Sequence, residues 1–112
     1  MPYVHLTTNR NLSDQQKADI KDFIIEAIQS IPDKGLRNTM VHIDSAYMFF
    51  KEDSNNCIFI ELRVYKKQPE EANQEFVDKM CNYLYEKLHI EKELIYFNIL
   101  ELDSWVTSGA IK

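Results

Sequence analysis

The strongest constraint on this chain is an internal repeat in the order strand, helix, strand. Strand-like stretches begin at Tyr3 and at Ile58, 55 residues further on. The strands that return after each helix contain Val41 and Tyr96, which are also 55 residues apart. The spacing predicts a duplicated βαβ unit. Within each unit, the crossover helix makes the two strands parallel neighbours.

The repeat accounts for most of the 112 residues. We expect a single domain over 1–112, with pseudo-repeats at about 2–46 and 58–102. The predicted fold class is α/β: a two-layer sandwich from a duplicated βαβ unit, in which a four-stranded sheet carries two helices on one face.

Local signals place the two helices. Ser13, followed by Gln16 three residues later, predicts a capping box at the start of a helix over about 14–31. Pro69 is typical of the first position of a second helix. The buried stripe of that helix is predicted at Phe76, Val77, Met80, Leu84 and Leu88.

The sheet face turned away from the helices carries large aromatic side chains together with a few polar groups. In the third strand, Phe59 and Tyr65 point away from the helices, and in the fourth strand Tyr96 and Asn98 do so. This face is too apolar to stay exposed to water over a whole sheet. We expect it to meet other subunits.

Charge and composition exclude several classes of protein. The chain has 18 Asp and Glu against 13 Lys and Arg, and a net charge of −5 opposes binding to nucleic acid. No apolar run reaches membrane-spanning length, and the N-terminus lacks the pattern of a secretory signal. We therefore expect no nucleic acid or membrane partner and a cytoplasmic location.

Metal and cofactor modules are not expected from the sequence. The two cysteines, Cys57 and Cys81, lie 24 positions apart without a C-x-x-C motif, which predicts reduced thiols and no structural zinc. The histidines are interpreted as structural residues. The chain has only two glycines, too few for a glycine-rich phosphate loop, so no nucleotide cofactor is expected.

The start of the chain and its last predicted strand resemble a known superfamily. Met1-Pro2 leads directly into a strand, and the helix opens with the segment Leu12-Ser13-Asp14-Gln15-Gln16-Lys17. Together they resemble the 4-oxalocrotonate tautomerase superfamily. The duplicated βαβ unit and the segment Leu94-Ile95-Tyr96-Phe97-Asn98 resemble its branch of macrophage migration inhibitory factor and 5-carboxymethyl-2-hydroxymuconate isomerase.

The resemblance implies a homotrimer with a keto-enol tautomerase site for a small-molecule substrate at each subunit interface. The catalytic base would be the amine of Pro2, exposed when Met1 is removed. Lys34 matches a substrate-binding lysine of the family, and Tyr65 matches a residue whose backbone N–H binds substrate. Tyr96 and Asn98 match pocket-lining positions that a neighbouring subunit contributes.

The proposed chemistry also has a physical basis. An apolar pocket beside a cation disfavours an ammonium ion and so lowers the pKa of a terminal amine. The neutral amine can then take a proton next to a carbonyl, while Lys34 or a backbone N–H stabilises the developing enolate oxygen. The expected substrate is an α-keto or enol carboxylate of phenylpyruvate type.

Several alternatives remain open at the level of sequence. Lys34 stands near a helix end and could simply bind backbone carbonyls there. The presence of Tyr96 and Asn98 at their positions is explained equally by packing at a subunit interface and by a role in lining a pocket. The alternative function is a catalytically inactive trimer with the same fold and a binding or signalling role.

Overall fold

The computed structural model describes residues 2–32, 38–51 and 56–112. Four strands form one mixed sheet in the order β2-β1-β3-β4. They are β1 (Tyr3–Thr8), β2 (Met40–Ser45), β3 (Ile58–Tyr65) and β4 (Ile95–Leu102). β1 runs parallel to β2 and β3 parallel to β4, whereas β1 and β3 are antiparallel. The two predicted βαβ units therefore meet side by side in opposite directions.

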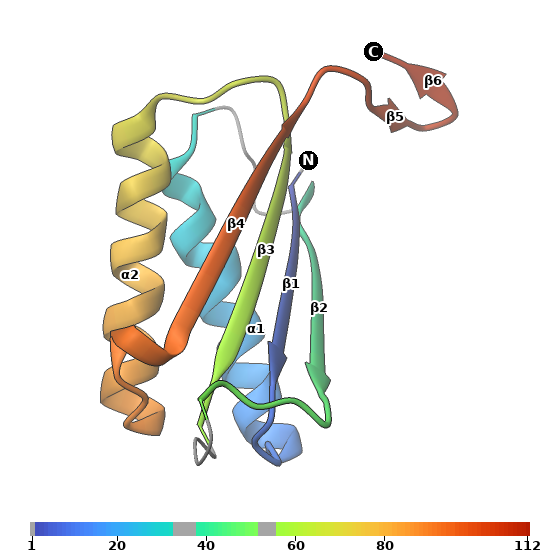
Figure 1. Ribbon diagram of the computed structural model, residues 1–112. Coiled ribbons are helices and arrows are strands. Elements are labelled where there is room, and N and C mark those ends of the chain that lie inside the picture. Colours follow the sequence, from blue (N-terminus) through green and yellow to red (C-terminus); the bar gives the residue numbers. More distant parts are fainter. Residues whose placement is uncertain (1, 33–37, 52–55) are drawn as a thin grey trace.

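Two helices cover one face of this sheet, as Figure 1 shows. α1 spans Asp14–Ala27 and α2 spans Glu70–Leu88. The predicted four-stranded sheet with both helices on one face is confirmed. Among the residues that the structure describes, no helix combines the length and the apolar character needed to cross a bilayer.

The capping box at the start of α1 is confirmed. The Ser13 hydroxyl accepts the backbone N–H of Gln16 at 3.0 Å, and the Gln16 side chain accepts the backbone N–H of Ser13 at 2.8 Å. α1 ends earlier than predicted, at Ala27, and is followed by a 3-10 turn, η1 (Ile28–Ser30). Ile31 is extended, at φ −90° and ψ 123°, because the ring of Pro32 disfavours helical backbone in the residue before it.

The core lies between the sheet and the helices. β1 contributes Val4 and Leu6, and β3 contributes alternate residues that are almost completely buried: Ile58, Ile60, Leu62 and Val64. α2 packs a stripe at four-residue spacing against them, consisting of Phe76, Met80, Leu84 and Leu88. The predicted inward faces of α2 and β3 are thus confirmed, apart from Val77, which is only partly buried.

A small hairpin follows the sheet and was not expected from the sequence. It consists of β5 (Val106–Thr107) and β6 (Ala110–Ile111), preceded along the chain by the 3-10 turn η3 (Lys92–Leu94) and β4. Gly109 turns the hairpin at φ 75°, a conformation that glycine adopts without steric cost. In Figure 1 the hairpin projects from the end of the sheet at which the chain begins.

Candidate active site

Pro2 stands immediately before β1 and is buried. Its carbonyl accepts the backbone N–H of Met40 at 3.0 Å, which extends the pairing of β1 with β2 by one step. The start of the chain is therefore held against the neighbouring strand. Pro2 thus has a fixed position relative to β1 and β2.

A cavity of about 490 Å³ opens beside Pro2. This volume lies within the range of roughly 300–1,000 Å³ that is usual for small-molecule sites. Its walls come from the start of β1, the segment leading into β2, and the C-terminal hairpin: Pro2, Tyr3, Asn38, Thr39, Met40, Trp105, Val106 and Thr107. Apolar side chains such as Trp105 and Met40 mix here with a few polar ones, as small-molecule pockets require.

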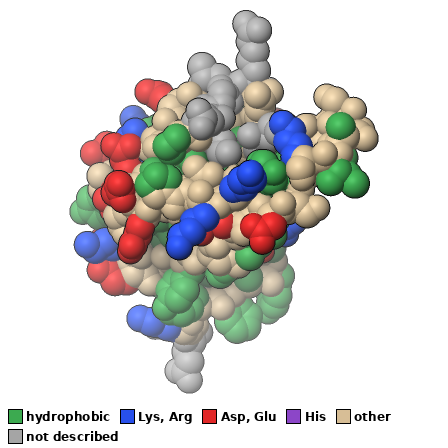
Figure 2. Space-filling view, turned by 90° about the horizontal axis from the view of Figure 1, so that it is seen from above, with side chains coloured by type: hydrophobic (Ala, Val, Ile, Leu, Met, Phe, Trp, Pro, Cys, Tyr) green, Lys and Arg blue, Asp and Glu red, His purple; other side chains and the backbone are tan. Residues whose placement is uncertain are grey.

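Charged side chains surround this end of the molecule. Figure 2 views the molecule from above and shows Lys and Arg side chains across the middle of this surface, where an acidic side chain also lies among them, with most of the other Asp and Glu at one side. β3 ends here, and the Lys66 ammonium lies 5.2 Å from the centre of the Tyr65 ring. The Lys and Arg side chains of this surface can attract a small anion despite the acidic net charge.

The structure brings one more predicted site residue to this end of the sheet. Tyr3 pairs with Arg63 in the antiparallel register, so Tyr65, at the end of β3, lies near the level of Pro2. Tyr65 is half-buried and is not among the residues lining the cavity. Lys34 lies outside the described residues.

Tyr96 and Asn98 lie away from Pro2 within one chain. Tyr96 is in register with Phe59 and, across β3, with Thr7, four residues along β1 from Tyr3. At roughly 3.3 Å per strand residue, this places Tyr96 about 13 Å further along the sheet. Its side chain is 52% exposed, and Asn98 is exposed as well. Only a second copy of the chain could therefore bring these two side chains to the Pro2 cavity.

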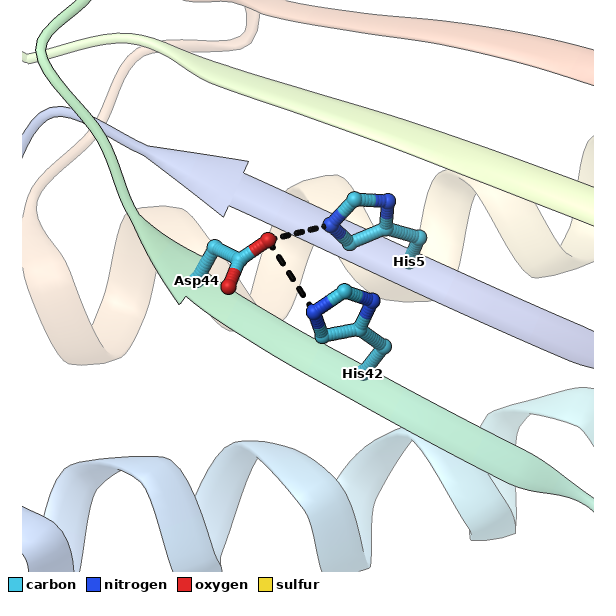
Figure 3. A group of neighbouring side chains, drawn as sticks. All are labelled: His5, His42 and Asp44. Atoms are coloured by element: carbon cyan, nitrogen blue, oxygen red, sulfur yellow. Dashed lines mark hydrogen bonds and ion pairs between the residues drawn. The ribbon is translucent and has the colours of Figure 1, made fainter.

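The sheet face away from the helices, which also carries Tyr96 and Asn98, holds a second group of polar residues, drawn in Figure 3. His5 on β1 and His42 on β2 are register partners, and their rings stack in parallel with centres 3.9 Å apart. Both Nε2 atoms approach the same carboxylate oxygen of Asp44, at 2.7 Å for His5 and 3.1 Å for His42. The hydrogen bond from His5, supported by His42, lowers the pKa of Asp44.

Sequence reasoning missed both the far wall of the cavity and this cluster. The wall depends on a hairpin of two-residue strands, for which only Gly109 and the single tryptophan, Trp105, gave any signal. The cluster depends on register: His42 and Asp44 share a face of one strand, but His5 joins them only when β1 pairs with β2. A stagger of one residue would have turned His5 to the other face.

Comparison with known proteins assigns the family. The family model for macrophage migration inhibitory factor (MIF) matches residues 1–110. The chain therefore belongs to the MIF family, within the tautomerase superfamily. A search of curated proteins found no match to this sequence.

Solved structures share the fold at low sequence identity. The MIF-like protein of Entamoeba histolytica is 17% identical, with a TM-score of 0.86 over 99% of this chain and 98% of that one. Leishmania major MIF2 is 13% identical, with a TM-score of 0.88 over 100% and 97%. Pt0534, solved after inactivation by 2-oxo-3-pentynoate, is 13% identical, with a TM-score of 0.82 over 96% and 93%. At these identities the likeness concerns the fold alone.

Proposed function

We propose that this protein is a keto-enol tautomerase that acts on a small α-keto or enol carboxylate of phenylpyruvate type, with the amine of Pro2 as general acid and base. The observation that carries the proposal is the burial of Pro2 in the wall of a cavity large enough for such a substrate. Membership of the MIF family supports the same chemistry.

The proposed proton transfers need only one titrating group. Burial disfavours a charged ammonium, so once Met1 is removed the Pro2 nitrogen would have a lone pair available for a C–H proton next to the substrate carbonyl. Removal of that proton moves negative charge onto the carbonyl oxygen as the enolate forms. The Pro2 ammonium then returns its proton to the enolate oxygen, which completes the conversion of keto to enol form.

The substrate carboxylate needs a cationic or hydrogen-bonding partner. Lys34 is the proposed partner because it matches a substrate-binding lysine of the family. Asn38 in the cavity wall provides an amide that can donate to the same group. The backbone N–H of Tyr65, together with Tyr96 and Asn98 from neighbouring copies, would complete the pocket in a homotrimer.

The decisive assay follows enolisation of phenylpyruvate by ultraviolet absorbance, with unmodified protein, Pro2→Ala and the matched control Pro69→Ala. Pro69 is exposed at the start of α2 and outside the cavity. General acid–base catalysis contributes about 10²- to 10⁴-fold, so Pro2→Ala should lose at least about 100-fold in kcat. Pro69→Ala should retain full activity, and equal rates for the unmodified protein and Pro2→Ala would exclude the mechanism.

The amine exists only if Met1 is removed, and intact mass measures that directly. We expect the purified protein to lack one methionine residue. If Met1 is absent and phenylpyruvate is still not turned over, the catalytically inactive trimer with a binding or signalling role becomes the better description.

A further inference from the structure

The cluster of His5, His42 and Asp44 has no part in the proposed proton transfers. None of its members lines the cavity beside Pro2. They project from β1 and β2 on the sheet face away from the helices, with their polar atoms directed at one point (Figure 3). We propose that these three side chains form a binding site for a divalent transition metal of the zinc class.

The donor atoms already stand close to the spacing that a metal requires. One ring nitrogen of each histidine and a carboxylate oxygen of Asp44 all lie within 4.8 Å of one another. In a tetrahedral zinc site, neighbouring ligand atoms are about 3.3 Å apart. The nitrogens stand 2.7 and 3.1 Å from the oxygen, and the two stacked rings, now parallel, would have to rotate about their side-chain torsions to point both lone pairs at one ion.

The donor chemistry narrows the choice of ion. Two imidazoles and one carboxylate suit zinc, iron(II), cobalt(II) and nickel(II) better than calcium or magnesium, which prefer oxygen ligands. In the single chain His42 and Asp44 are 47% and 44% exposed, so water can reach the remaining coordination position there. Three protein ligands with one open position distinguish this arrangement from a closed structural site.

The surroundings hold the ligands in place. The Tyr3 hydroxyl lies 2.8 Å from Nδ1 of His42, and a metal on Nε2 would make Nδ1–H the donor to that oxygen. Hydrogen bonds of this kind orient metal-binding histidines and strengthen binding. Glu61 lies opposite His5 on β3, and its carboxylate is paired with Arg63 at 3.0 Å. The Glu61 carboxylate is thus engaged by Arg63 rather than directed at the three ligands.

The test is zinc binding by isothermal titration calorimetry on metal-free protein, followed by Co²⁺ titration to read the coordination geometry from the visible spectrum. We expect one ion per chain. His42→Gln and Asp44→Asn should each weaken zinc binding by at least about 10-fold, and Tyr3→Phe by about 10-fold through loss of the orienting hydroxyl.

Two matched controls exclude other donors on the chain. His89→Asn removes the third histidine at a left-handed position that asparagine tolerates, and Cys81→Ser removes the more exposed thiol. Both should bind zinc like the unmodified protein. Retained affinity in His42→Gln and Asp44→Asn, or no zinc binding at millimolar concentration, would overturn the proposal.

A second measurement does not depend on the variants folding. In unmodified protein with ¹⁵N-labelled histidine, zinc should shift the Nε2 resonances of His5 and His42 and leave those of His89 unchanged. Unchanged His5 and His42 resonances at saturating zinc would count against the site. Neither readout uses enzymatic turnover, so a failure here is distinct from a failure of the tautomerase proposal.

Discussion

At the residue scale, the two cysteines show how the fold sets chemical behaviour. Both are free thiols. Burial raises the pKa of Cys81, and the nearby carboxylate of Asp78 raises it further, while Lys92 opposes the change. Burial likewise raises the pKa of Cys57, which is only 2% exposed. Since the thiolate is the reactive form, both residues should be poor nucleophiles at neutral pH.

This predicts slow alkylation that accelerates as the pH rises. With a raised pKa, the protonated thiol predominates at pH values where an ordinary cysteine is already partly ionised. Iodoacetamide should therefore modify Cys81 more slowly than free cysteine at neutral pH, and Cys57 more slowly still because reagent cannot reach it. Peptide mass spectrometry over a pH series measures both rates, and faster modification of Cys81 than of free cysteine would contradict the account.

At the scale of elements, most of the fold was predictable because each helix and strand carries its own local signal. The Ser13 capping box and the four-residue spacing of the α2 stripe are readable without tertiary information. The antiparallel pairing of β1 with β3 is not, since it joins two separate units. The same limit applies to the candidate sites: Pro2 was found from its place in the chain, but the Trp105 wall and the His5 cluster required the assembled sheet.

The C-terminal hairpin is the element whose role is easiest to test. Gly109 adopts φ 75°, and a Cβ there would meet no atom within 4 Å, so Gly109→Ala introduces backbone strain without a clash. Left-handed backbone costs a non-glycine residue roughly 1–2 kcal/mol. We expect the hairpin to loosen, Trp105 fluorescence to shift to longer wavelength, and KM for phenylpyruvate to rise more than kcat falls.

Ser104→Ala, just before the same hairpin, is the control and should leave the emission spectrum and KM unchanged. Since β5 and β6 lie outside the main sheet, the melting temperature should hardly change in either variant. An unaltered Trp105 spectrum in Gly109→Ala would mean that the hairpin does not depend on this turn.

At the scale of the whole molecule, the sheet face away from the helices leaves large apolar side chains in water. Tyr96 is 52% exposed, Leu100 38% and Leu102 37%, all on β4. Exposed apolar surface of this extent is typical of an interface between copies. The homotrimer implied by the family resemblance stays a prediction, and it would also bring Tyr96 to a neighbouring Pro2.

Assembly can be tested with a pair of tyrosines of equal exposure. Tyr96 on β4 and Tyr85 on α2 are both 52% exposed, on opposite layers of the molecule. Sedimentation velocity should show a trimer for the unmodified protein. Tyr96→Arg should dissociate it because an unpaired charge in an apolar interface is costly, whereas Tyr85→Arg should not. A stable monomer of unmodified protein at micromolar concentration would reject the interface.

The strand order β2-β1-β3-β4 also affects how the chain can associate with other chains at high concentration. β2 and β4 form the two borders of the sheet, and along each border the outward backbone amides and carbonyls can template another strand. If the rotation that relates one copy to the next returns to the first copy, the copies form a closed ring in which no edge strand is left unpaired. Copies that join through any other rotation keep growing, so closure is what separates a finite particle from a fibre.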